Sequence, residues 1–214
     1  MALDAKKRQQ KLAKKAAKRK AVLATKKPAW SAGGMVPHGR HAVPAASAPI
    51  HACLVSDSLF DIGIGNVIVS RKMPNGSIGA AFFLVDVFCL GIKDAFYDVL
   101  SPVEYDYRVS GLQHETFRAI HPTCARKLVE GAEAYARDLG LNPPADYQRA
   151  GQIFGDLDAT VCPTSYVFGK DGKPFFMSGP YDTPVRCRRI IDTLTRRCGP
   201  EGFHFTAAGG ALLE

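Results

Sequence analysis

The sequence predicts an α+β fold: a single domain with two β-hairpins, each followed by helices, and a mostly antiparallel sheet. Apolar runs flank turn-forming residues at positions 74–77 and again at positions 170–173, which is the pattern of a β-hairpin. Amphipathic helical periodicity follows each of these regions. The chain has 214 residues, 46% of them hydrophobic, which supplies enough apolar material for one core.

Charge and composition divide the chain into an arm, a linker and a body. Residues 1–27 hold 11 of the 28 Lys and Arg and one of the 20 acids, a net charge of +10, which leaves residues 28–214 with 17 against 19, a net of −2. We expect residues 1–27 to be a disordered or frayed-helical arm, because the segment has no apolar stripe to bury. The Pro/Gly/Ala-rich residues 28–49 are predicted to be a linker, residues 50–206 the globular domain and residues 207–214 a loose tail.

The first hairpin is centred on Pro74-Asn75-Gly76-Ser77, since Asn-Gly between apolar runs is the strongest short hairpin signal. Val67-Ile68-Val69 precedes the turn, and a long apolar run from Ile78 to Ile92 follows it. The second strand, around residues 80–90, is apolar on both faces, which predicts a central strand covered on both sides. Only Asp86 interrupts this strand.

Three helices are expected between the hairpins. Ser101-Pro102-Val103-Glu104 combines an N-cap Ser, a Pro in the first turn and a capping-box Glu. Residues 121–139 have apolar positions at helical spacing, and Gly140 is placed to end that helix. A shorter helix is predicted from Ala145 to about Phe154, ending at Gly155.

The second hairpin is expected around Lys170-Asp171-Gly172-Lys173, with residues 166–168 and 175–177 as its strands. Thr183-Pro184 then opens a helix whose apolar positions continue to Cys198. Residues 203–205 are predicted to form a last short strand.

The six cysteines lack a CxxC pair and several lie in apolar segments, so we expect reduced, buried thiols rather than disulfides. The chain shows neither the apolar stretch of a secretory signal nor a run of ~18 apolar residues. A cytoplasmic protein without a membrane partner is therefore the expectation.

The basic arm is the clearest functional signal. Lys and Arg that neutralise phosphates release condensed counterions, so the arm is predicted to bind nucleic acid, RNA rather than DNA, without reading bases. A solvated leader that aids solubility, or a targeting segment, is the alternative. The arm residues expected to contact phosphates are Lys6, Lys7, Arg8, Lys11, Lys14, Lys15, Lys18, Arg19 and Lys20.

The predicted helix after Thr183 gives a second cationic signal. At ~100° per residue its arginines fall within about 100° of one another, on one stripe suited to phosphate contacts. A solvated helix face, paired with acids such as Asp192, is the alternative. The arginines of this stripe are Arg186, Arg189, Arg196 and Arg197.

Asp86 is a candidate for chemistry, because a carboxylate on a buried strand needs an ion, a hydrogen-bond donor or a metal as its partner. Asp156 and Asp158 are the residues that would complete a Mg²⁺ site with it, in a metal-dependent nuclease or hydrolase. In the structural alternative, Asp86 accepts hydrogen bonds from backbone amides or pairs with Lys93 or an Arg.

Cys124 is a candidate nucleophile. It lies in the first turn of a predicted helix, in His121-Pro122-Thr123-Cys124, where the helix dipole lowers a thiol pKa and His121 is close in sequence. The alternative is a small buried residue in a capped helix. The Cys and His residues lack the paired spacing of a structural zinc site, so no metal is expected at them.

Three stretches resemble a family of uncharacterised bacterial proteins that often carry a Lys/Arg-rich leader: residues 83–97 (FLVDVFCLGIKDAFY), 124–141 (CARKLVEGAEAYARDLGL) and 168–184 (FGKDGKPFFMSGPYDTP). The resemblance covers most of the body. It implies one intact domain and a bacterial setting, and it brings no catalytic residue or ligand.

These features predict an RNA- or ribonucleoprotein-associated accessory protein, tethered by its basic arm and needing no cofactor. The alternatives are an enzyme, either the Mg²⁺-dependent one built on Asp86 or a thiol enzyme built on Cys124, and a protein-interaction module without catalysis. Whether the chain is an enzyme stays open at this point, as do its protein partners.

Overall fold

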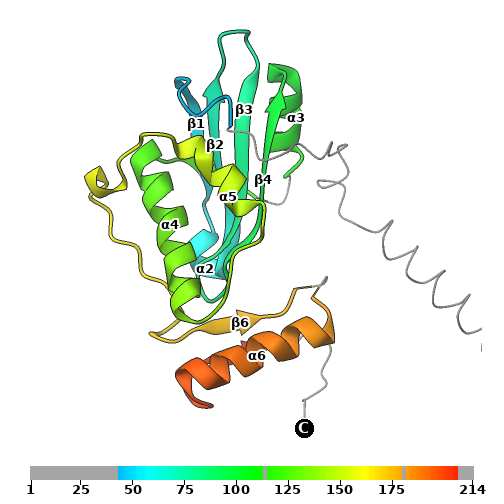
Figure 1. The fold of residues 1–214 in the computed structure, drawn as a ribbon, viewed down its shortest axis with the longest axis vertical. Coiled ribbons are helices and arrows are strands. Elements are labelled where there is room, and N and C mark those ends of the chain that lie inside the picture. The colour runs from blue at the N-terminus through cyan, green and yellow to red at the C-terminus, as the bar shows by residue number, and fades with distance from the viewer. Residues whose placement is uncertain (1–42, 113–114, 180–181, 207–214) are drawn as a thin grey trace, which may run out of the picture. The chain divides into compact units, whose positions relative to one another are not determined.

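The computed structural model describes residues 43–112, 115–179 and 182–206 (Figure 1). All of them belong to one compact unit. The predicted arm at residues 1–27, most of the predicted linker and the predicted tail at residues 207–214 lie outside the described residues.

The predicted α+β class is confirmed. A five-stranded antiparallel sheet has the strand order β4-β3-β2-β1-β5. Its strands are β1 (Ile50–Ser56), β2 (Ile64–Lys72), β3 (Ile78–Asp86), β4 (Gly91–Leu100) and β5 (Phe117–Ala119). The helices around it are α2 (Leu59–Ile62), α3 (Pro102–Ser110), α4 (Pro122–Asp138) and α5 (Tyr147–Gly151), with short 3-10 turns η2 (Gln152–Phe154) and η3 (Ala159–Val161).

The first hairpin is confirmed as β2 and β3, but its second strand ends at Asp86: residues 87–90, which were predicted to continue the strand, form the turn to β4. Gly76 has a φ of +83° in the turn, where a side chain would be strained, and Asn75 Oδ1 accepts from the Ser77 amide at 3.0 Å. The strands pair from Lys72↔Ile78 to Ile64↔Asp86. The strong turn signal therefore sets the register of two central strands.

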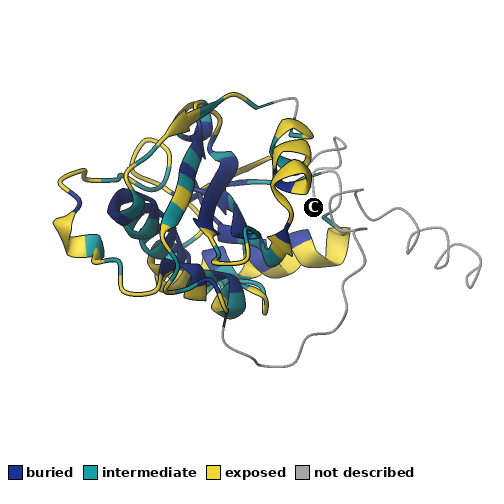
Figure 2. Cartoon of the chain, turned by 90° about the horizontal axis from the view of Figure 1, so that it is seen from above, coloured by how far each residue is buried: buried dark blue, intermediate teal, exposed yellow. Residues whose placement is uncertain are grey.

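Strand β3 is covered on both faces, as its apolar pattern predicts. One face carries Phe83, which packs with Leu128 of α4 under α4 and α5. The other face carries Phe82, which packs with Ile68 and with Tyr105 of α3. Figure 2 shows burial concentrated in this central sheet, while the outer surfaces of α3 and α6 (Pro184–Cys198) are exposed.

The predicted helices are confirmed with their end signals. Helix α3 has the full capping box: Ser101 Oγ accepts from the Glu104 amide, and Glu104 Oε2 accepts from the Ser101 amide at 2.8 Å. Helix α4 covers most of the predicted range and is followed by Gly140 at φ +82°. The predicted shorter helix is α5 continued by η2. No helix in the described ranges is both long and apolar enough to cross a bilayer.

The second hairpin is wrong as predicted. Its turn closes only through an isolated bridge, Lys170↔Lys173. Residues 166–168 run along α4 instead of forming a strand, since Phe168 stacks on Tyr135 at 5.7 Å between ring centroids. The second expected strand, β6 (Phe175–Met177), pairs in parallel with β7 (His204–Thr206).

The body begins before Ile50, so the predicted linker is too long. Val43 and Ala45 are buried in the core, and Gln152 Oε1 accepts from the Val43 amide at 2.9 Å. Buried Arg71 reinforces this contact by donating to the backbone oxygens of Ala48 at 2.5 Å and Ile153 at 2.7 Å. Residues 43–49 thus form part of the folded unit.

Candidate nucleic-acid interface

Helix α6 presents one buried face and a cationic remainder. Its N-cap Thr183 accepts from the Arg186 amide at 3.2 Å, and Pro184 occupies the first turn. Cys187, Ile190 and Leu194 are buried at helical spacing. They pack in a small cluster of their own, completed by Phe176, Phe203, Leu139, Cys89 and Leu90.

The exposed side of α6 carries five arginines and one acid. Two of the arginines are tied to neighbouring elements: Arg186 lies 3.3 Å from Asp182 Oδ1, and Arg197 donates to the backbone oxygen of Asp138 at 2.6 Å. Arg196 bonds only within the helix, to the Asp192 backbone oxygen at 3.2 Å and to a threonine hydroxyl.

Arg188 and Arg189 differ from these three. Neither guanidinium makes a hydrogen bond or ion pair with any residue in the described part of the chain, and both are exposed. Each guanidinium has five N–H donors in a planar fork that matches a phosphate. These two side chains are therefore the free cationic groups of α6.

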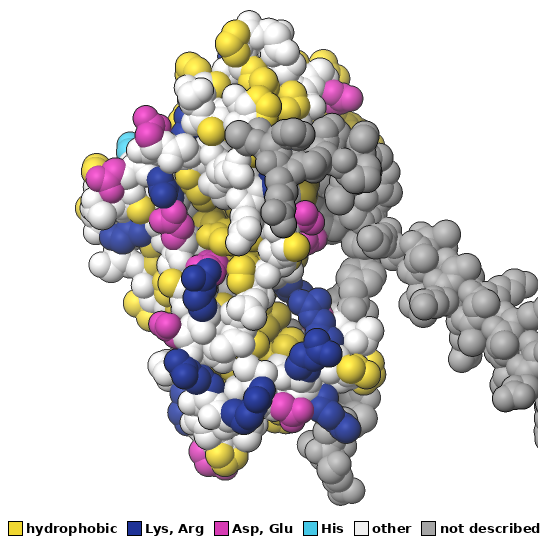
Figure 3. All heavy atoms as spheres, viewed as in Figure 1, with side chains coloured by type: hydrophobic (Ala, Val, Ile, Leu, Met, Phe, Trp, Pro, Cys, Tyr) yellow, Lys and Arg dark blue, Asp and Glu magenta, His cyan; other side chains and the backbone are white. Residues whose placement is uncertain are grey.

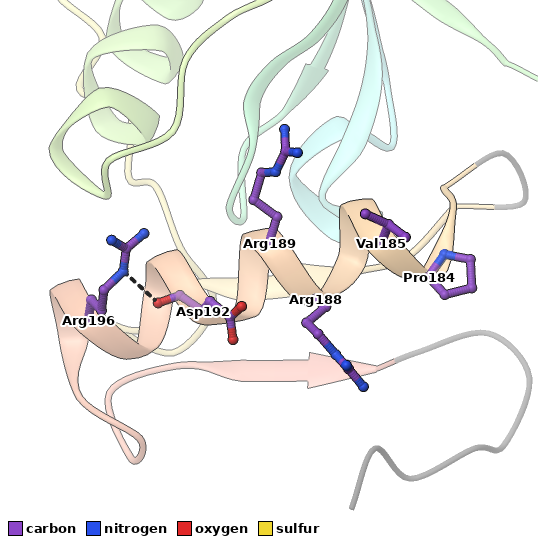
Figure 4. Close-up of a pocket in the computed structure, with 6 residues that line it drawn as sticks. All are labelled: Pro184, Val185, Arg188, Arg189, Asp192 and Arg196. Atoms are coloured by element: carbon purple, nitrogen blue, oxygen red, sulfur yellow. Dashed lines mark hydrogen bonds between the residues drawn. The ribbon is translucent and has the colours of Figure 1, made fainter.

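A hollow of about 750 Å³ lies along the exposed surface of α6 (Figure 4). Figure 4 shows Arg189 and Arg196 pointing to one side of α6, with Arg188 pointing to the other. Val185, 71% exposed, adds an apolar surface beside them. In Figure 3, Lys and Arg side chains surround apolar surface in this lower part of the molecule. The lining residues are Pro184, Val185, Arg188, Arg189, Asp192 and Arg196.

The predicted arginine stripe is only partly brought together. Arg189 and Arg196 line the hollow, whereas Arg186 and Arg197 do not. The prediction missed Arg188, which also lines the hollow, although Arg188 directly precedes Arg189 on the predicted helix. The predicted contacts of the arm, Lys6 to Lys20, lie outside the described residues.

Asp86 has the structural role that was the alternative prediction. It is 4% exposed, and its Oδ1 accepts from the amides of Phe88 at 3.0 Å and Cys89 at 2.9 Å. Burial raises the pKa of this carboxyl to about 6, against the lowering effect of the amides and of Lys93. The turn it holds, residues 87–90, accepts the Phe175 amide at Phe88 O and places Leu90 in the α6 cluster. Asp86 thus stabilises the turn at residues 87–90, which packs against α6.

The three aspartates of the metal hypothesis do not converge. Asp158 is exposed and caps η3, where its Oδ1 accepts from the Thr160 amide at 2.8 Å. Asp156 is exposed, and its charge acts on Arg71. Across residues 43–112, 115–179 and 182–206, no three His, Cys, Asp or Glu side chains are grouped to hold a metal ion. Asp86, Asp156 and Asp158 are therefore not grouped as the metal hypothesis requires.

Cys124 is not a free thiol. It forms a disulfide with Cys162, with a Cα–Cα distance of 5.0 Å, which corrects the expectation that the cysteines are reduced. His121 does not activate it: His121 Nδ1 lies 2.7 Å from Thr123 Oγ1. The prediction failed because 38 residues separate the two cysteines, and only the packing of the intervening chain brings them together. Three other cysteines, Cys53, Cys89 and Cys187, are free and buried as expected.

Comparisons of the chain with protein-family models, with curated proteins and with solved structures found no match. The resemblance to an uncharacterised bacterial family stays a prediction.

Proposed function

We propose that this protein is a cytoplasmic, RNA-associated accessory protein, tethered by its basic arm and contacting RNA a second time through α6. The observation that carries the proposal is the pair of unpartnered guanidiniums, Arg188 and Arg189, beside a hollow on an exposed helix. The arm, with a net charge of +10, supplies the larger share of the attraction for phosphates.

RNA is favoured as the nucleic acid because the hollow combines cationic and apolar groups. Single-stranded RNA offers phosphates together with unstacked bases, which rest against apolar side chains and guanidinium planes. Pro184 and Val185 provide the apolar surface, and Arg188 and Arg189 provide the guanidiniums. A duplex would engage only the charges.

The test compares α6 variants of the full-length chain in binding a fluorescent single-stranded RNA of about 20 nucleotides. Each lost phosphate contact lowers the slope of log affinity against log salt by about 0.7. The double replacement Arg188→Gln/Arg189→Gln is expected to lower the slope by about 1.4. Arg118→Gln is the control for loss of one exposed cation away from α6: the Arg118 side chain is 56% exposed on β5, and its Nε lies 3.7 Å from Asp57 Oδ1.

The expected result is a reduced slope and weaker binding for the double variant, with the control equal to the wild type. Equal slopes for all three proteins would show that α6 does not contact the RNA. A binding loss as large for Arg118→Gln would mean that net charge, and not the α6 surface, determines the affinity.

A further inference from the structure

The segment from Gly155 to Gly169, named the strap below, runs along the outer side of α4 from η2 toward β6 (Figure 1). Its backbone hydrogen bonds are local, from the Leu157 amide to Phe154 O and from the Cys162 amide to Ala159 O. The next bond from its backbone to the body is the Gly169 amide to Val87 O at 2.9 Å. Within the described residues, no backbone ladder fixes the strap between these points.

Side chains of α4 hold the strap instead. At its beginning, Arg126 donates to the backbone oxygens of Gly155 at 3.2 Å and Leu157 at 2.5 Å. At its middle, Lys127 Nζ donates to Cys162 O at 2.9 Å. These bonds come from neighbouring residues in the first half of α4, so the strap is fastened mainly at one end of the helix.

The Cys124–Cys162 disulfide is the covalent part of this fastening. Cys162 is 2% exposed, whereas Val161 before it is 65% exposed and Pro163 after it is exposed. Tyr166 OH then donates to the Cys124 backbone oxygen at 3.3 Å. Cys162 is therefore the buried covalent anchor of the strap, whose other core contacts, at Leu157, Tyr166 and Phe168, are half-buried.

The strap covers a stripe of α4. Phe168 lies so close to Gly131 that a Cβ there would meet its ring at 3.0 Å. The same ring stacks on Tyr135 at 5.7 Å. Cys124, Gly131 and Tyr135 lie at helical spacing, so release of Cys162 would loosen the cover of one face of α4.

The start of α4 favours Cys124 Sγ as the sulfur that leaves as a thiolate when the disulfide is reduced. Cys124 lies in the first turn of α4, which contains no acidic residue and whose N-cap His121 makes no side-chain cap bond. Unpaired amides at a helix start stabilise a thiolate. The sulfur with the lower thiol pKa is the better leaving group in thiol–disulfide exchange.

We propose that Cys124–Cys162 is a reversible thiol–disulfide exchange site that latches the strap to α4. A thiolate of a dithiol reductant bonds to Cys162 Sγ, the S–S bond breaks, and its electron pair leaves on Cys124 Sγ, which then takes a proton. The second thiol of the reductant displaces Cys162 as a thiol and closes a cyclic disulfide. Two electrons and two protons pass to the protein, and a disulfide oxidant reverses the exchange.

The inference is independent of RNA binding and has its own readout, cleavage of the full-length protein by chymotrypsin after Tyr166 and Phe168. Dithiothreitol is expected to raise the rate of cleavage at these two sites at least tenfold, and reoxidation with oxidised dithiothreitol restores the slow rate. Cys162→Ser is expected to be cleaved fast without reductant. Cys53→Ala, which removes a buried free thiol, keeps the full redox dependence.

Three results would overturn the proposal. Equal cleavage of the oxidised and reduced protein would show that the disulfide does not hold the strap. A disulfide that persists in dithiothreitol, seen as an unchanged count of alkylated thiols in the folded protein, would show that it is not an exchange site. Cleavage throughout the chain after reduction, with loss of near-ultraviolet circular dichroism, would show that it holds the whole fold.

Discussion

Replacement of Asp86 by Asn tests how the charge of this buried carboxyl contributes to the stability of the protein. Asp86 ends β3 at 4% exposure, and its Oδ1 accepts two backbone amides that shape the turn to β4. Asn retains an acceptor oxygen at this position but cannot ionise. The variant therefore separates the hydrogen bonds, which both residues can make, from the charge, which only the aspartate carries.

The size of the effect follows from the pKa of the carboxyl. Burial raises this pKa from an ordinary 3.8 to about 6 in the folded protein. The Asp86 carboxyl loses its proton at a lower pH in the unfolded chain than in the folded protein. Its contribution to stability is therefore fully present below pH 3.8 and is lost as the pH rises through 6. A shift of this size corresponds to about 3 kcal/mol at pH 7.

The assay is urea unfolding of the wild type and of Asp86→Asn at intervals from pH 3.5 to 8. The free energy of unfolding of the variant, relative to the wild type, is expected to rise by about 3 kcal/mol between these limits, as an upper value. Asp86→Ala removes the acceptor and is expected to destabilise the protein at every pH. A difference between wild type and Asp86→Asn that stays constant with pH, or falls as pH rises, would refute the reasoning.

Local packing and backbone geometry give three further predictions, each measured as a change in the free energy of unfolding. Phe83→Ala is expected to lower the free energy of unfolding by about 3–5 kcal/mol, because Phe83 is fully buried, and a loss below about 1 kcal/mol would contradict its place in the core. Gly91→Ala is expected to cost at least about 2 kcal/mol, since φ is +64° and a Cβ would meet Ala132 O at 2.5 Å. Gly151→Ala, in open space on α5, should instead stabilise the protein by about 0.5–1 kcal/mol. Equal effects at the two glycines would contradict both expectations. Ser101→Ala is expected to cost about 1 kcal/mol through loss of the N-cap, and no loss would show that the capping box is idle.

The parts of the fold that were predictable are those specified by neighbouring residues. Asn75-Gly76 determines a hairpin turn by its own conformational preferences, and Ser101 with Glu104 caps a helix within one turn. Strands β1, β4 and β5 were missed for physical reasons. Strand β4 mixes charged and apolar residues and is paired through a bulge opposite Leu84/Val85, so its sequence shows no clean alternation.

The candidate site was less predictable because it depends on contacts between distant segments. The Lys170–Lys173 turn exists, but its flanks separate because Phe168 packs on α4 and β6 pairs with β7. Periodicity placed the arginines on α6 correctly. It could not show that Arg186 pairs with Asp182 or that Arg197 donates to the Asp138 backbone oxygen. The Cys124–Cys162 bond likewise depends on tertiary packing.

The most direct test of the proposed RNA association is the salt dependence of RNA binding with and without the charges of the arm. The full-length protein is compared with a variant in which the 11 Lys and Arg of residues 1–27 are replaced by Gln, across about 50–200 mM salt. We expect neutralisation to weaken binding at least tenfold at about 100 mM salt and to lower the salt slope by several units, with about 8 as the ceiling. Unchanged affinity and slope would contradict it.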